Sequence, residues 1–400
     1  MILTKEEERV LNGADGNAAA KSMKILVALG EIYGAEKLIP VGSVQVAGVS
    51  YDNLGDAGLA YLDELARDGQ VKVLTTLNPA GMDLRDWRKL GISDEFAGKQ
   101  QKVVEAFSKM GIVTTCTCTP YLIGNLPSFG EHVAWAESSA VTFANSVIGA
   151  RSNREGGPSA IAAAMVGKTP AYGLHLDVNR VPKIYVKVEA KVKSLADYGA
   201  LGYVLGKISG GRIPYITGVG ASNTDYLKSF GASFITYGGP ALYHMKGVTP
   251  EASLHKKPKE KVVVAKKDLD EAYKALNDEA GDVDFVSLGC PHASIREIAE
   301  VAAYLKDKKV KAGVELWVAT ARPTKDIADE RGYTKIIEDA GGKMAVDTCM
   351  VVAPIKGRFK TMATTSAKAC FYARGKNKMA VHIGDFKKCL ETAVTGRWAH

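Results

Sequence analysis

The chain has 400 residues, of which 46% are hydrophobic and 24% are charged, so it can form two or three domain-sized units around a large buried core. Because a core of that size folds without disulfide bonds or a structural metal, any metal site would serve chemistry. The 52 Lys and Arg residues exceed the 44 Asp and Glu residues by eight, but the excess is spread along the chain, and this pattern favours a small anionic substrate over a nucleic acid.

The N-terminal residues are predicted to form a helix and not a signal peptide. Thr4 and Glu7 have the spacing of a capping box, and Gly13 is a stop signal for the helix. No window of about 18 apolar residues escapes a charge or a Gly or Pro break, so we expect no membrane span. The six cysteines are too few and too far apart for a disulfide framework, which indicates a reducing compartment. We therefore expect a cytoplasmic protein.

Residues 1–125 are predicted to form a first βα domain. Short apolar runs alternate there with amphipathic helical stretches, which is typical of βαβ units. The expected strands are 45–49, 71–76 and 111–115, and the expected helices are 55–67 and 99–110. The last strand leads into the sequence Cys116-Thr-Cys-Thr-Pro120.

Residues 126–255 are predicted to contain a segment rich in small residues, followed by a mixed αβ subdomain. Between 131 and 168 the composition shifts to Ala, Ser, Asn and Gly, which let backbones and ligands approach closely. Strict alternation at 184–192 predicts a strand with one solvent-facing side, in a smaller and partly antiparallel subdomain. Gly218-Val-Gly220 resembles part of a dinucleotide loop, but Asn223 replaces the third glycine, so we expect no Rossmann cofactor.

Residues 256–400 are predicted to form a second βα domain, which begins with a basic linker at 256–261. Ser294 and Glu297 form a second capping box that opens a helix ending near Leu305. The expected strands are 262–265, 284–288, 314–319 and 343–347. The predicted fold class is therefore α/β, with βα units, mostly parallel sheets and the smaller mixed subdomain.

The residues best suited to chemistry follow the ends of predicted strands. They are Gly48-Val49-Ser50, Asn78-Pro79, Cys116 with Cys118, Cys290, and Cys349. Ligands gather at the carboxyl ends of parallel strands, because loops and helix starts there offer free N–H groups. Thiolates from three distant loops can hold a metal, and sulfur ligands select iron–sulfur clusters or zinc.

Buried packing is the alternative role for every cysteine, since a free cysteine behaves as a small hydrophobic residue. We expect packing roles for Cys370 and Cys389, which lie in segments of helical or mixed character. Cys116 and Cys118 compete for one ligand position, because the C-x-C spacing makes it awkward for both to face one metal. We favour Cys118, because Pro120 follows closely and fixes its loop.

Further polar residues are candidates for substrate chemistry. Glu137 and Ser138 begin the small-residue stretch, where a carboxylate could orient a substrate hydroxyl or carry protons. Arg151 and Arg154 could hold a carboxylate or a phosphate through paired N–H donors. The alternative for this group is a helix-start glutamate with surface arginines. His292 is either a proton carrier or a helix-start residue.

Four features of the sequence together indicate a family. They are CTCTPY at 116–121, ESSAVTFANSVIGARSNREGGP at 137–158, GCPH at 289–292, and the late Cys349. With these features the sequence resembles the aconitase X group of the aconitase superfamily over essentially the whole chain. The resemblance implies an aconitase-like fold around a central cluster site and the activity of a hydro-lyase, that is, a dehydratase. The CxxC pair of ordinary aconitases is absent here, so their residue roles are not transferred.

The resemblance also implies roles for individual residues. Cys118, Cys290 and Cys349 match the family's ligands for an iron–sulfur cluster, in a three-iron or four-iron form. The active-site string contains Glu137 and Ser138. The loops expected to bind the substrate contain Gly48, Val49, Ser50, Asn78 and Pro79.

Members of this group differ in how their domains are joined. They are either a fused bacterial protein, similar to cis-3-hydroxy-L-proline dehydratase, or an archaeal pair of a large and a small subunit. No small-domain sequence follows within the 400 residues, so the resemblance implies the large subunit of a heterodimer whose separate small subunit has about 130 residues.

The archaeal pair converts (R)-5-phosphomevalonate to trans-anhydromevalonate 5-phosphate and water, a step of the archaeal mevalonate route to isoprenoids. The resemblance therefore implies this reaction for the chain. The alternatives are a cis-3-hydroxy-L-proline dehydratase of the same family and a non-catalytic protein with a structural zinc.

Dehydration at such a site needs a Lewis acid, a base and a contact for the phosphate. Three protein thiolates leave one metal position without a protein ligand, and that position could bind the tertiary hydroxyl of the substrate. The candidates for the base are Glu137, Ser138, His292 and the small subunit. Loop N–H groups and Arg151 or Arg154 are expected to hold the phosphate.

Overall fold

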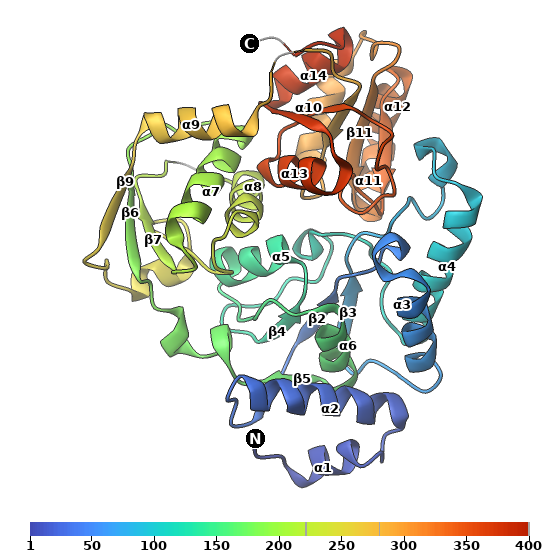
Figure 1. Cartoon of the computed structure of the whole chain (residues 1–400), viewed down its shortest axis with the longest axis vertical. Coiled ribbons are helices and arrows are strands. Elements are labelled where there is room, and N and C mark those ends of the chain that lie inside the picture. Colours follow the sequence, from blue (N-terminus) through green and yellow to red (C-terminus); the bar gives the residue numbers. More distant parts are fainter. Residues whose placement is uncertain (221, 280, 399–400) are drawn as a thin grey trace.

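The computed structural model describes residues 1–220, 222–279 and 281–398. Its strands form three parallel sheets, which follow one another along the chain and are surrounded by helices (Figure 1). A further antiparallel pair joins β1 (Leu38–Pro40) to β5 (Lys168–Pro170). The prediction of an α/β fold with mostly parallel sheets is confirmed.

The first unit, residues 1–181, contains a sheet in the order β3-β2-β4. The buried central strand β2 (Ser43–Val46) lies parallel to β3 (Leu74–Leu77) and to β4 (Val133–Trp135). The capping box of Thr4 and Glu7 is confirmed. The predicted strand at 111–115 is wrong, because Val113 makes only a single bridge to Thr76. The helical elements are α1 (Lys5–Leu11), α2 (Asn17–Ile32), α3 (Tyr51–Leu65), η1 (Trp87–Leu90), α4 (Asp94–Lys109), η2 (Pro120–Leu122), α5 (Ser138–Phe143), η3 (Ala144–Ile148), α6 (Gly157–Val166), η4 (Gly173–His175) and η5 (Asp177–Arg180).

The second unit, residues 182–277, contains a sheet in the order β8-β7-β6-β9. Buried and partly exposed residues alternate along β6 (Ile184–Val188), as predicted. The predicted antiparallel pairing is wrong: every pair in this sheet is parallel, because helices carry the chain back between β6 and β7 and between β7 and β8. The other elements are α7 (Leu195–Ser209), β7 (Pro214–Thr217), α8 (Thr224–Thr236), β8 (His244–Met245), η6 (Pro250–Leu254), β9 (Lys261–Val264) and α9 (Lys266–Leu276).

The basic run at 256–261 leads into β9, which pairs with β6 of the second unit. The run therefore precedes a strand of the second sheet. The division of the chain into domains at 1–125, 126–255 and 256–400 stays a prediction.

The third unit, residues 281–398, contains five parallel strands in the order β12-β11-β10-β13-β14. The capping box of Ser294 and Glu297 is confirmed at the start of its first helix. Two of the five strands, β13 and β14, were not predicted. The elements are β10 (Phe285–Leu288), α10 (Ile295–Leu305), β11 (Glu315–Thr320), α11 (Arg322–Glu330), α12 (Tyr333–Asp339), β12 (Lys343–Val346), β13 (Thr361–Thr364), α13 (Ala367–Tyr372), η7 (Ala373–Asn377), β14 (Ala380–Ile383) and α14 (Phe386–Thr395).

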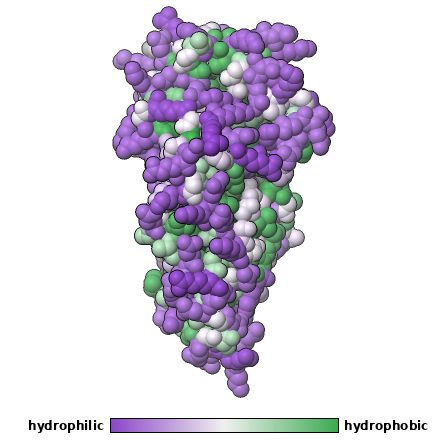
Figure 2. All heavy atoms as spheres, turned by 90° about the vertical axis from the view of Figure 1, so that its right-hand side faces the viewer, coloured by the Kyte–Doolittle hydropathy of each residue, from purple (hydrophilic) through white to green (hydrophobic). Residues whose placement is uncertain are grey.

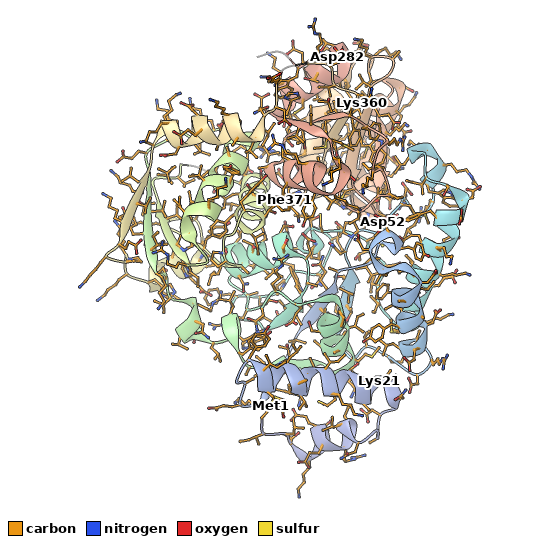
Figure 3. All side chains as sticks on the ribbon, viewed as in Figure 1. Met1, Lys21, Asp52, Asp282, Lys360 and Phe371 are labelled. Atoms are coloured by element: carbon orange, nitrogen blue, oxygen red, sulfur yellow. The ribbon has the colours of Figure 1, made fainter. Side chains whose placement is uncertain are left out.

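The first and third units meet through the loops that follow their strands. In Figure 1 the third unit, in orange and red, lies above β2, β3 and α5. Ser50 Oγ, beyond the end of β2, donates a hydrogen bond to Val352 O of the third unit at 2.8 Å. Asp52, which Figure 3 labels near this junction, forms an ion pair with Lys376 at 2.9 Å. The carboxyl ends of the two sheets therefore face each other.

Each unit contributes to the buried core. Trp135, Phe230 and Trp317, one from each unit, are among the largest fully buried side chains. On the side shown in Figure 2, hydrophilic residues predominate and hydrophobic residues form small patches. Among the described helices, none is both long enough and apolar enough to cross a membrane.

Candidate active site

The candidate site lies where the strand order of two parallel sheets reverses. In the third unit the chain passes from β10 to β11 and β12 on one side, and β13 then returns to the other side of β10. In the first unit β3 lies on one side of β2 and β4 on the other. Loops that leave the central strands at such a reversal diverge, and ligands of doubly wound folds bind between them. Gly48 and Cys290 lie in the loops after the central strands β2 and β10, and Glu137 and Lys368 lie at the starts of the helices that follow the neighbouring strands β4 and β13.

Three cysteines come together between these loops. Cys290 follows the end of β10, and Cys349 follows the end of β12. Burial is the main cause that raises the pKa of each thiol. The charge of a neighbouring thiolate raises it further, from Cys349 on Cys118 and from Cys290 on Cys349. Contacts join the three loops: Cys118 accepts a hydrogen bond from the backbone two residues after Cys290, and Cys290 packs against the same buried cluster as Cys349. The structure therefore brings Cys118, Cys290 and Cys349 into one site, which we call the cysteine site.

The structure separates the two cysteines of the C-x-C pair. Cys118 Sγ accepts a hydrogen bond from His292 N at 3.2 Å, beside the Cys290 loop. Cys116 instead packs into the core of the first unit, and the charged group with the largest effect on its thiol is Asp347. The geometry therefore supports Cys118 over Cys116.

The remaining two cysteines lie in the hydrophobic core of the third unit, where Cys370 shares a cluster with Cys349 and Cys290. Cys370 and Cys389 are both fully buried in the third unit. Cys389 Sγ donates a long hydrogen bond of 3.7 Å to Gly384 O. These surroundings agree with the packing roles that the sequence predicts for them.

His292 holds two of the cysteine loops in place. Its Nε2 donates to Thr348 O at 3.0 Å, so its Nδ1 is the nitrogen that accepts from Thr117 Oγ1 at 2.9 Å. These partners directly precede Cys349 and Cys118 in the chain. Burial lowers the pKa of His292 to about 4, so the ring is neutral at neutral pH. Because both ring nitrogens are occupied, the geometry argues against the predicted role of His292 as a proton carrier.

Glu137 caps the start of α5 with its side chain 12% exposed, and both of its carboxylate oxygens accept hydrogen bonds. Oε2 accepts from Asn78 Nδ2 at 3.0 Å, and Oε1 accepts from Ser139 Oγ at 2.9 Å and from Lys368 Nζ. Ser138 Oγ lies 3.5 Å from Oε1. Burial pushes the pKa of Glu137 upward, but the charge and hydrogen bond of Lys368 and the bonds from Ser139 outweigh it, and the pKa falls to about 2. Glu137 is therefore ionised and is a weak base.

Lys368 is a site residue that the sequence analysis missed. It is buried in the first turn of α13 and forms an ion pair with Glu137. Burial lowers the pKa of its ammonium group, but the charges of Glu137 and Cys290 raise it more, so Lys368 stays charged. Ser366, also missed, caps α13 and lowers the pKa of the Cys290 thiol. The available signal is the polar run TTSAK after the apolar residues of β13, since both residues follow a strand end like the predicted ones.

The predicted substrate loops lie at the carboxyl ends of β2 and β3. Gly48 has a φ of +82°, a backbone conformation that favours glycine, and the hydroxyl of Ser50 reaches the third unit. Val49, Asn78 and Pro79 are buried. Asn78 Oδ1 has no hydrogen-bond partner among the described residues. Because a buried oxygen without a partner is costly, Asn78 Oδ1 is a candidate acceptor for a substrate hydroxyl.

The two arginines of the 137–158 string lie at opposite ends of β4. Val133 N, at the start of this strand, donates to Arg151 O at 2.9 Å. Glu155 N donates to Trp135 O, at the end of the strand, at 3.0 Å, and Arg154 is the exposed residue next to it. The structure therefore does not bring Arg151 to the carboxyl ends, which argues against its predicted phosphate contact. It places Arg154 on that side.

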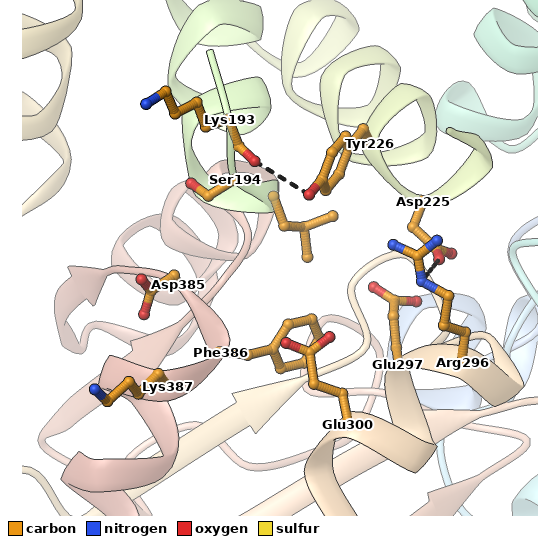
Figure 4. A pocket seen from close by; sticks show the side chains of 11 residues that line it. Lys193, Ser194, Asp225, Tyr226, Arg296, Glu297, Glu300, Asp385, Phe386 and Lys387 are labelled. Atoms are coloured by element: carbon orange, nitrogen blue, oxygen red, sulfur yellow. Dashed lines mark hydrogen bonds and ion pairs between the residues drawn. The ribbon is translucent and has the colours of Figure 1, made fainter. Parts of the chain in front are cut away.

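A second buried ion pair supports the cysteine site from the second unit. Lys228 Nζ, on α8, donates to His292 O at 3.0 Å and forms an ion pair with Glu297. Glu297 also lines an open pocket together with Asp225 and Arg296, which Figure 4 shows from close by. The start of α10, and with it the loop of Cys290, is therefore fixed by a residue of another unit.

The chain is similar to known proteins both in sequence and in structure. The models of the three successive domains of aconitase X match the chain at residues 1–178, 182–274 and 283–395. The crystal structure of Thermococcus kodakaraensis aconitase X in its holo form superposes with a TM-score of 0.92 at 48% identity, over 98% of this chain and 100% of that one.

Two curated relatives indicate the range of activities. A protein of Methanocaldococcus jannaschii named phosphomevalonate dehydratase large subunit is 50% identical, over 98% of this chain and 100% of its own length. A cis-3-hydroxy-L-proline dehydratase of Hypocrea jecorina is 34% identical, over 98% of this chain and 69% of its own length.

Proposed function

The chain belongs to the aconitase X family, and we propose that it is the large subunit of a hydro-lyase that converts (R)-5-phosphomevalonate to trans-anhydromevalonate 5-phosphate and water. The observation that supports the proposal is that the thiols of Cys118, Cys290 and Cys349, of which Cys290 is only partly buried, lie beside the Lys368–Glu137 ion pair at the carboxyl ends of two sheets. We infer the substrate from the name of the relative that is 50% identical to this chain. Because that relative is named a large subunit, we propose that a separate small subunit completes the enzyme.

We propose that Cys118, Cys290 and Cys349 hold an iron–sulfur cluster. The N–H of His292 and the charge of Lys368 both favour the thiolate forms that such a cluster needs. Lys368 acts on Cys118 and on Cys290, and the chemistry of this donor set fits the cluster. When bound, the cluster supplies a Lewis acid that polarises the leaving hydroxyl.

The spacing of the three sulfurs argues against the structural-zinc alternative. Within the described part of the chain, the three cysteines do not form a group whose ligand atoms all lie within 4.8 Å of one another. Four ligands around a single zinc ion would place the sulfurs about 3.8 Å apart, given Zn–S bonds of about 2.3 Å. A cluster of several irons accepts the wider separation.

The ion pair at the site has a direct role in holding the substrate. Lys368 Nζ has three N–H donors, of which one goes to Glu137 and one, at 3.4 Å, to Ser139 Oγ. The third is free to hold the carboxylate of the substrate, whose charge grows as the neighbouring C–H proton leaves. Glu137 fixes both Lys368 and Asn78, and Asn78 Oδ1 accepts a hydrogen bond from a substrate hydroxyl.

Two candidates remain for the base that removes this proton. Glu137, with a pKa of about 2 and both oxygens occupied, is a weak base, and His292 has no free ring nitrogen. Ser138 Oγ makes only a long hydrogen bond of 3.5 Å and can turn toward a substrate. A neutral hydroxyl is a weaker base than a carboxylate, so Ser138 can serve only after losing its own proton. We therefore propose that a residue of the small subunit acts as the base.

Replacing Arg154 with glutamine is expected to raise KM for phosphomevalonate about tenfold or more, because a charged hydrogen bond to phosphate is worth about 1.5–3 kcal/mol. The kcat is expected to change little, since the phosphate is remote from the reacting atoms. Arg151→Gln is the matched control, because Arg151 lies at the other end of β4. Steady-state kinetics of both variants measure this, and an unchanged KM for Arg154→Gln would place the phosphate elsewhere.

Substrate choice separates the two dehydratases of the family. The chain is purified anaerobically with a small subunit of about 130 residues, and kcat/KM is measured for phosphomevalonate and for cis-3-hydroxy-L-proline. We expect phosphomevalonate to be preferred by about 10⁴, because a site built for a polar group rejects a substrate that lacks it. Dehydration of cis-3-hydroxy-L-proline by the chain alone, at a comparable rate, would contradict the proposal.

A further inference from the structure

A second group of potential metal ligands lies in the second unit, away from the cysteine site. His244 is on β8, Glu251 is in η6, and His255 directly follows η6. Each offers one ligand atom, and these atoms all lie within 4.8 Å of one another. We propose that His244, Glu251 and His255 bind a divalent transition-metal ion, with Zn²⁺ as the best match. This inference does not depend on the proposed dehydratase activity.

The hydrogen bonds of His244 leave one ring nitrogen ready to bind a metal. His244 is fully buried, and its Nε2 lies 2.7 Å from Arg180 O. A carbonyl oxygen only accepts, so Nε2 carries the hydrogen and Nδ1 carries a free lone pair. Nδ1 is buried and has no hydrogen-bond partner among the described residues. Metal-binding histidines are held in this same way, with the second ring nitrogen donating to a backbone carbonyl.

The carboxylate of Glu251 is oriented by Arg180, whose guanidinium group is itself held in place by hydrogen bonds. Arg180 is 1% exposed and donates to Glu251 through Nε, at 3.0 Å to Oε2, and through Nη2, at 2.7 Å to Oε1. Nε is also 3.1 Å from Oε1, so Oε2 accepts from a single donor and keeps a free lone pair. The remaining Arg180 donors go to Asn145 and to backbone carbonyls. Arg180 therefore fixes the carboxylate as an outer-shell partner would.

Of the three proposed ligands, His255 is the one that is accessible to solvent and able to move. It is partly exposed, and its ring centroid lies 4.5 Å from that of His244. Ligand atoms of a tetrahedral zinc site lie about 3.4 Å apart, given Zn–N bonds of about 2.0–2.1 Å. His255, at the end of a short helix, can make the closing movement. It also borders an open pocket with Phe129 and Pro250, from which an ion and a water ligand can enter.

The donor set selects the kind of ion. Two imidazoles and one carboxylate are the set found in several zinc enzymes, whereas Mg²⁺ and Ca²⁺ prefer oxygen ligands throughout. Arg180 cancels the charge of Glu251, so the group has little net charge to attract a hard cation. A bound ion would fasten residues 250–255 to β8.

Zinc binding by the intact protein tests this proposal. The cluster-loaded chain, with its cysteine site occupied, is treated with a chelator, desalted and titrated with ZnCl₂ by calorimetry. We expect one tight site in the wild-type protein, and about tenfold or weaker binding in His255→Gln, because even outer-shell partners of a metal contribute about 10–100-fold in affinity. His132→Gln is the control, since His132 is a partly buried histidine that pairs with His175 and is not one of the three proposed ligands. It is expected to bind zinc like the wild type.

X-ray absorption at the zinc edge of the wild-type protein provides a test that needs no variant. We expect nitrogen and oxygen ligands with the outer-shell scattering of two imidazoles. Sulfur ligands would show that zinc occupies a cysteine instead, and would overturn the proposal. Equal zinc affinity in His255→Gln and the wild type, or no retained zinc in the wild type, would overturn it too.

Discussion

Replacing Cys290 with alanine is expected to abolish both the iron–sulfur cluster and dehydration. Cys290 lies at the reversal point of the third sheet, where its thiol has Lys368 and Ser366 as neighbours. The loss of one of three thiolate ligands is expected to lower activity at least about a hundredfold, since even outer-shell partners contribute up to that amount. Iron and acid-labile sulfide analysis, with the visible absorbance of anaerobically purified protein, measures the cluster, and a dehydration assay measures the activity.

Two other cysteines provide matched controls for this variant. Cys389→Ala removes a fully buried thiol of the same unit, and Cys116→Ala removes the neighbour of Cys118 that faces the first unit's core. Both are expected to keep the iron, the colour and the activity. A colourless Cys290→Ala protein with full activity would refute the ligand assignment, and loss of iron in Cys116→Ala would show that the wrong member of the C-x-C pair was chosen.

Replacing Lys368 with methionine is expected to lower kcat about 10²–10³-fold, the loss measured when one donor to a developing negative charge is removed. It is also expected to destabilise the protein by about 3–5 kcal/mol, because the largely buried carboxylate of Glu137 loses its counter-charge. Kinetics and denaturant unfolding measure the two effects. Lys335→Met is the control, since its pair with Asp339 is exposed and is worth less than about 1 kcal/mol.

The contribution of Glu137 to stability is expected to change with pH in opposite directions in the wild type and in Lys368→Met. In the wild type the pKa of Glu137 falls from its ordinary value of 4.5 to about 2, so its stabilising effect is full above 4.5 and is lost as the pH falls toward 2. In Lys368→Met burial is the main remaining influence and raises this pKa. The variant should therefore lose stability relative to the wild type as the pH rises through the raised pKa.

The double variant Lys368→Met with Glu137→Gln separates stability from catalysis. Removing both charges leaves no unpaired ion in the core, so most of the lost stability is expected to return. The activity is not expected to return, because the ammonium that holds the substrate carboxylate is still missing. Recovery of activity in the double variant would mean that Lys368 serves only to neutralise Glu137.

The elements that position the site could be predicted where the pattern is local. Capping boxes at Thr4 and Ser294 appear as expected, and the strands before Cys290 and Cys349 lie within a residue or two of their predicted ranges. Apolar runs followed by Gly, Cys or Asn mark strand ends, so Asn78 and the cysteines could be identified as site candidates before the structure was known.

Other features of the site depend on contacts between distant residues, which a local sequence pattern does not reveal. The strand β13 is short and its sequence TMAT is only half apolar, so Lys368 behind it was not recognised. His292 was a candidate base until both its ring nitrogens proved to be occupied by residues far away in the chain. Arg151 and Arg154 are three residues apart, and only the pairing of their segment with β4 shows that they face opposite ends.

The most direct test of the central claim is an anomalous difference map at the iron edge, from crystals of the complex grown anaerobically with (R)-5-phosphomevalonate. We expect iron bonded to Cys118, Cys290 and Cys349, with the substrate carboxylate at Lys368 and a substrate hydroxyl at Asn78. Iron bonded to Cys116, or a substrate bound away from the Lys368–Glu137 ion pair, would contradict it.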